Sequence, residues 1–128
     1  MGTPRIRVQL GVPEDSDADL IVLAGEHAQL RPDGRTVVIA APRWHLPSGP
    51  EHALADAYRE ALSWANARKA RSMAVPAILA RGPWPLEEVT RIALAVLQGT
   101  PTTVREVVVV AGTPAMLERW AEAIARAA

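Results

Sequence analysis

The residues best suited to bind a small molecule stand directly after apolar runs of the chain, where a strand would lead into a loop. They combine a flexible backbone with cationic, acidic and aromatic side chains. They are Ala24, Gly25, Glu26 and His27, then Arg43, Trp44 and His45, and finally Ala80, Arg81, Gly82 and Trp84. In open α/β sheets, ligands lie beyond the carboxyl ends of the strands. We therefore expect these residues to meet at one edge of a sheet and to form a ligand cleft.

Arg81 and Trp84 admit two interpretations. In the first, Arg81 pairs with a phosphate, Trp84 stacks on a base, and the helix expected to start at Pro85 favours an anion. However, anion cradles are built from backbone N–H groups, and Pro83 and Pro85 have none. In the second interpretation, Arg81 is a solvated loop residue and Trp84 packs over the helix start.

Metal binding and catalysis have weaker support in the sequence. The three histidines, His27, His45 and His52, could approach Glu26 at the same sheet edge, but their spacing matches no compact ligand motif. Glu26 or His27 could act as a general base, yet no nucleophile stands beside them. The chain has no cysteine, which excludes thiolate catalysis and cysteine-bound zinc. We expect no catalytic residue, no metal and no cofactor.

Length and charge limit the classes of partner. The 128 residues fit one domain, 1–128, and 14 basic residues balance 14 acidic ones. A net charge of zero gives no electrostatic attraction to nucleic acid or to an acidic membrane. No run approaches the roughly 20 apolar residues of a membrane helix. We expect a soluble, cytoplasmic protein that binds neither nucleic acid nor membranes.

Strands and helices alternate along the chain. Residues 5–10 alternate apolar and polar side chains, and continuous apolar runs at 20–24, 37–41, 73–78 and 107–111 are typical of strands covered on both faces. Helical spacing predicts three helices: one from the capping-box pair Ser48 and Glu51 through Ala65, one from Pro85 to about Gln98, and one after Pro114. The pattern predicts an α/β fold of three layers, α/β/α, with a mainly parallel five-stranded sheet. Residues 25–34 are too few for a crossover helix, so we expect a loop or one short turn there.

Several segments resemble a known family when taken in order. The stretch 57–62 (AYREAL) resembles that family's central helix, and 72–78 (SMAVPAI) is similar to its strand S-I-A-F-P-A-I. Segment 85–89 (PLEEV) matches the start of the next helix, 19–22 (DLIV) looks like the strand D-A-I-V, and 37–44 like the strand that ends G-P-x-W. On these segments, which span nearly the whole chain, it resembles a macro domain. The resemblance implies ADP-ribose binding and, as in some members of the family, hydrolysis of ADP-ribosyl bonds. It also implies that the 5–10 strand lies beside the 107–111 strand in the sheet.

The same resemblance marks the positions where this chain departs from the family. Val12 stands where an aspartate contacts adenine, and 23–26 (LAGE) replace N-A-A-N, whose last asparagine faces the distal ribose. The glycine-rich helix that follows is deleted, and 79–85 (LARGPWP) replace the second phosphate loop. We expect a diverged binding module for an ADP-ribose-like or other nucleotide-type small molecule, with affinity for ADP-ribose at least about a hundredfold below that of an intact macro domain.

The alternative is a structural or protein-interaction domain whose ancestral pocket has closed. Its arginine and tryptophan loops would then contact a protein partner or a second copy of the chain. An ADP-ribosyl hydrolase is the least favoured function, because the ribose-facing asparagine is missing.

Overall fold

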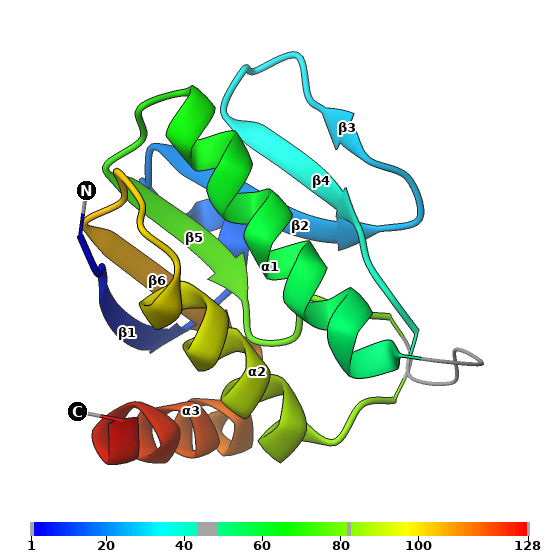
Figure 1. Cartoon of the computed structure of the whole chain (residues 1–128), viewed down its shortest axis with the longest axis vertical. Coiled ribbons are helices and arrows are strands. Elements are labelled where there is room, and N and C mark those ends of the chain that lie inside the picture. Colours follow the sequence, from blue (N-terminus) through cyan, green and yellow to red (C-terminus); the bar gives the residue numbers. More distant parts are fainter. Residues whose placement is uncertain (1, 44–48, 82, 128) are drawn as a thin grey trace.

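The computed structural model describes residues 2–43, 49–81 and 83–127. A six-stranded sheet runs through the molecule in the order β1-β6-β5-β2-β4-β3 (Figure 1). Its strands are β1 Arg5–Leu10, β2 Leu20–Gly25, β3 Gln29–Leu30, β4 Thr36–Ala40, β5 Ser72–Pro76 and β6 Glu106–Ala111. The helices are η1 Pro13–Asp15, a 3-10 turn, and α1 Pro50–Ala67, α2 Leu86–Gly99 and α3 Pro114–Ala127.

The five predicted strands are all present and all parallel. β1 pairs with β6, as Ile6 opposite Val107 shows, and so confirms the predicted neighbours. The sheet has a sixth strand that the sequence did not predict: β3 has two residues and runs antiparallel to β4. A strand of this length has no periodic pattern to recognise.

The α-helices α1, α2 and α3 pack against one face of the sheet. Val107 and Val109 of β6 share a core cluster with Trp120 of α3 and with the inward stripes of α1 and α2, and Figure 1 shows α1 and α2 across the same side. The second face is covered in part by η1, over a small separate cluster of Ala18, Ala74, Val108 and Val110. The second face thus carries a 3-10 turn, whereas the α-helices lie on the first face.

The handedness of the connections explains this asymmetry. From β4 to β5 and from β5 to β6, the chain steps across the sheet in the same direction. Because parallel crossovers are right-handed, α1 and α2 must lie on the same face. Only the β2–β4 connection is left to cover the outer part of the second face, and it is too short to hold a helix.

The β2–β4 connection confirms the prediction that no helix lies between Gly25 and Arg35. It contains β3 and a turn in which Asp33 accepts hydrogen bonds from the backbone N–H groups of Arg35 and Thr36, both at 2.9 Å. The Thr36 hydroxyl donates to the same carboxylate at 2.7 Å. The Arg35 backbone bond, followed by those from Thr36, lowers the pKa of Asp33 from 3.8 to about 2.

The helix ends agree with the predicted limits to within a few residues. α1 starts at Pro50 after Gly49, whose φ of 67° lies in the left-handed region. Ser48, half of the predicted capping box, lies outside the described residues. No helix within the described parts of the chain has the length and apolar character needed to cross a membrane.

Candidate functional site

The carboxyl ends of β2, β4 and β5 bring together four of the predicted site residues. The backbone N–H of Ala41 donates to the Gly25 carbonyl at 2.9 Å, which ties the end of β4 to the end of β2. The N–H of Arg81 donates to the Pro42 carbonyl at 2.9 Å, and Arg43 and Arg81 form an isolated parallel bridge. Gly25, Glu26, Arg43 and Arg81 therefore lie at one edge of the sheet.

The guanidinium of Arg81 is held in place at this edge. Its Nε donates to the Ala41 carbonyl at 3.0 Å, and its Nη1 lies 3.4 Å from Oε1 of Glu26. The Arg81 side chain is 29% exposed, whereas that of Glu26 is 70% exposed. Because a guanidinium carries five N–H donors, Arg81 retains donors for a further acceptor.

Gly25 is required by the close approach of β2 and β4. A Cβ atom at this position would lie 2.5 Å from Cγ1 of Val38. Val38 is β-branched and stiff at χ1, so it has little freedom to move away. The glycine thus fixes the strand spacing beside Glu26.

A groove of about 690 Å³ opens beside these residues on the helix-free face of the sheet. Leu23, Val38 and Pro76 point to this face because their strand neighbours belong to the helix-facing core. The groove is bordered by η1 on one side and by the β2–β4 connection on the other. The remaining lining residues are Pro13, Glu14, Ala24, Gly25, Glu26, His27, Gln29 and Arg31.

The groove walls include residues that the sequence analysis did not single out. Pro13 and Glu14 come from η1, Gln29 belongs to the unpredicted strand β3, and Arg31 directly follows that strand. The combination Pro-Glu-Asp at 13–15 does indicate a turn, but no local signal shows which strand this turn packs against.

Other predicted site residues lie elsewhere. Trp84 is buried, with 8% exposure, and belongs to the core cluster that also contains Val89 of α2. This position agrees with the second interpretation, in which Trp84 packs over the helix start, and gives a base no exposed ring to stack on. Ala80 packs against the same core. Gly82, Trp44 and His45 lie outside the described residues.

No group of three or more potential metal ligands occurs among the described residues. His27 lines the groove, whereas His52 lies on α1 with its Nε2 atom 3.7 Å from Oδ2 of Asp56.

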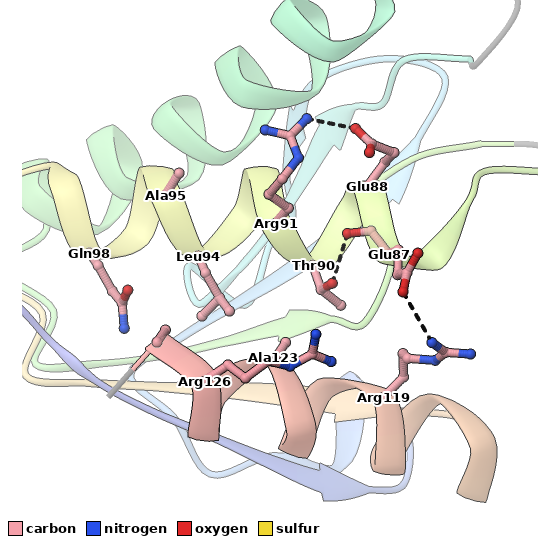
Figure 2. A pocket seen from close by; sticks show the side chains of 11 residues that line it. Glu87, Glu88, Thr90, Arg91, Leu94, Ala95, Gln98, Arg119, Ala123 and Arg126 are labelled. Atoms are coloured by element: carbon pink, nitrogen blue, oxygen red, sulfur yellow. Dashed lines mark hydrogen bonds and ion pairs between the residues drawn. The ribbon is translucent and has the colours of Figure 1, made fainter.

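A second hollow of about 490 Å³ lies between α2 and α3 (Figure 2). Its charged side chains largely neutralise one another: Arg91 pairs with Glu88 at 2.6 Å and Arg119 with Glu87 at 3.4 Å. Exposed pairs of this kind leave no strong net field for a charged ligand.

Comparison with known proteins identifies relatives by sequence and by structure. No protein-family model matches the chain. A macro domain-containing protein of Streptomyces nogalater is 38% identical over 78 residues, which are 59% of this chain and 42% of that protein. The chain thus spans less than half the length of this curated relative.

Two solved structures of a macrodomain from Oceanobacillus iheyensis share the fold. One, with MES bound, gives a TM-score of 0.72 at 17% identity, over 94% of this chain and 90% of that one. The other, with ADP, gives a TM-score of 0.61 at 26% identity, over 72% of this chain and 50% of that one. Together with the curated relative, these structures confirm the resemblance predicted from the sequence.

Proposed function

We propose that this chain, whose fold is that of the macro domains, is a binding module for a nucleotide-type small molecule. The observation that carries the proposal is the position of the Arg81 guanidinium, fixed by the Ala41 carbonyl at the sheet edge where Glu26 enters the groove. The macrodomain that is 26% identical was solved with ADP, a ligand of the proposed class.

In this proposal the groove and Arg81 have separate tasks. Arg81 donates to a phosphate through charge-assisted hydrogen bonds, which are about twice as strong as neutral ones. Leu23, Val38 and Pro76 offer an apolar floor to the flat face of a base or a ribose. Burial of an apolar ligand face contributes about 25 cal/mol for each Å² removed from water.

The proposed affinity for ADP-ribose is weak. Val12 is 51% exposed and offers no hydrogen-bond acceptor to an adenine amino group. The exposed carboxylate of Glu26 repels a diphosphate and already pairs with Arg81. The β2–β4 connection contains no helix whose N–H groups could bind the phosphates.

An interaction domain is the second candidate, and exposed apolar side chains favour it. Leu10 and Val12, at the end of β1, are 54% and 51% exposed. Such residues suit contact with a protein partner or a second copy of the chain.

Calorimetric titration with ADP-ribose, ADP, AMP and NAD separates the two candidates. Binding of any of the four tighter than about 0.1 mM, equivalent to about 5.5 kcal/mol, supports the module. Absence of heat with all four, together with a concentration-dependent sedimentation coefficient, supports the interaction domain.

A further inference from the structure

The opposite edge of the sheet, where the parallel strands begin, carries a second polar groove. It measures about 670 Å³ and lies against the segments that lead into β1, β5 and β6. Its lining residues include Lys69, Arg71 and Arg105, together with Thr102 and Thr103. Because the parallel strands share one direction, this groove lies at the edge of the sheet opposite the one that carries Arg81 and Glu26.

All three charged residues of this groove are cations. Among the described residues, no carboxylate lies within ion-pair distance of Lys69, Arg71 or Arg105. The carboxylate of Asp19 accepts the backbone N–H of Arg71 at 2.9 Å, but it does not line the groove. In a protein of zero net charge, this is a local concentration of uncompensated positive charge.

The backbone that carries these cations is well fixed. The Arg71 carbonyl accepts the N–H of Arg105 at 2.7 Å, which joins the entries of β5 and β6. Oδ1 of Asn66 accepts the Thr102 hydroxyl at 2.6 Å and the Thr103 N–H at 3.0 Å. A fixed backbone lowers the cost of ordering the long cationic side chains around a ligand.

Lys69 follows α1 in a left-handed conformation. Its φ of 55° is left-handed, and it is the only non-glycine residue with positive φ in the described parts of the chain. It follows the end of α1, a position where glycine is usual because a side chain there is strained. The N–H of Ala70 donates to the Ala65 carbonyl at 2.9 Å, so the end of the helix accounts for this conformation and brings Lys69 to the groove that Arg71 also lines.

We propose that this groove binds an anion with two or more linked phosphate groups, with Lys69, Arg71 and Arg105 as its ligands. Arginine forms paired hydrogen bonds to phosphate oxygens, and lysine adds a mobile point charge. Three cations around one groove match the several negative charges of linked phosphate groups better than the charge of a single phosphate. Such an anion is available free in solution or as the headgroup of a phosphoinositide.

Tripolyphosphate titrated into the full chain at low salt tests the proposal. We expect saturable binding whose affinity falls as the salt concentration rises. In the double variant Arg71→Gln, Arg105→Gln, the affinity should fall at least about tenfold, which corresponds to the loss of about one charge-assisted hydrogen bond. The matched control, Arg59→Gln with Arg126→Gln, removes the same charge from exposed helix surfaces and should bind like the unmodified chain. Equal affinity of the double variant and the control, or no saturable binding by the unmodified chain, overturns the proposal.

Lys69→Gly separates binding from folding. Glycine relieves the left-handed strain, so this variant should melt at a higher temperature and yet bind tripolyphosphate more weakly. A higher melting temperature with unchanged binding would show that Lys69 is not a ligand. Arg81→Ala removes the phosphate ligand of the proposed nucleotide site, so a loss caused by Arg71→Gln with Arg105→Gln in the Arg81→Ala background tests this groove independently of that site.

Vesicles distinguish the two sources of the anion. Retention on phosphatidylcholine vesicles that contain a phosphoinositide bisphosphate, lost in the double variant, identifies a lipid headgroup. Tripolyphosphate binding without retention identifies a free ligand. Retention that the double variant does not reduce contradicts the site.

Discussion

The ion pair between Arg81 and Glu26 makes opposite predictions for the two partners. Any phosphate that Arg81 binds must compete with the Glu26 carboxylate, whose Oε1 lies 3.4 Å from Nη1. With Glu26 70% exposed, the pair itself contributes about 0–1 kcal/mol to folding. Glu26→Gln should therefore leave the fold stable and strengthen the binding of an anionic nucleotide, whereas Arg81→Ala should weaken it.

The expected magnitudes follow from charge and geometry. A carboxylate about 5 Å from a phosphate charge repels it by about 0.8 kcal/mol in water, so Glu26→Gln should raise affinity about fourfold. Loss of a charge-assisted hydrogen bond costs about 1.5–3 kcal/mol, so Arg81→Ala should lower affinity by about tenfold to 150-fold. Arg43→Ala, on the neighbouring loop, should have a smaller effect, because in the part of the chain that the structure describes Glu26 forms an ion pair with Arg81 and none with Arg43.

Calorimetry with ADP on the unmodified chain and the three variants measures these differences. The melting temperature of each variant is the control for folding, since Nε of Arg81 also donates to the Ala41 carbonyl at 3.0 Å. Weaker binding by Glu26→Gln, or unchanged binding by a folded Arg81→Ala variant, would refute the reasoning. In that case the phosphate would not lie beside Arg81.

Three further predictions concern the elements that position the site. Tyr58→Phe removes the hydroxyl that accepts the Leu79 N–H at 3.4 Å, and should lower the free energy of unfolding in urea by about 1 kcal/mol. Gly25→Ala should destabilise by about 1–3 kcal/mol through overpacking against Val38, and adding Val38→Ala should restore part of the loss. The pKa of Asp33 is about 2 in the folded chain and 3.8 as its ordinary value, so its stabilising effect is complete above pH 3.8 and is lost as the pH falls through 2. Between these two pH values, the melting temperature of Asp33→Asn should therefore fall less steeply than that of the unmodified chain.

The sequence predicted most of the sheet because its strands are strongly apolar. The continuous apolar runs 20–24 and 107–111 are typical of strands covered on both faces, and the order of neighbours followed from the family resemblance. β3 escaped prediction because two residues, Gln29 and Leu30, carry no period. The apolar runs alone predicted that helices cover both faces of the sheet. The face on which the helices lie depends instead on the length and handedness of the connections between strands.

Part of the candidate site could be predicted from the order of the strands. Gly25, Glu26 and Arg81 meet because parallel strands end at one edge, which strand assignment alone predicts. The bond from Arg81 to the Ala41 carbonyl and the burial of Trp84 depend on long-range packing, which has no signal in local sequence.

The short β2–β4 connection links the form of the sheet to the proposed groove. Both faces of a parallel sheet are normally covered by helices. Here η1 covers only the central strands of the second face. Ala18 and Ala74 are small enough for η1 to pack closely against the sheet at that point. Farther toward β4, Leu23 and Val38 have no such cover and form the groove floor instead. Because this connection holds no helix, it leaves an apolar surface open and offers no helix N-terminus to an anion. In the proposed function, the ligand is therefore held more by its flat face than by its phosphates.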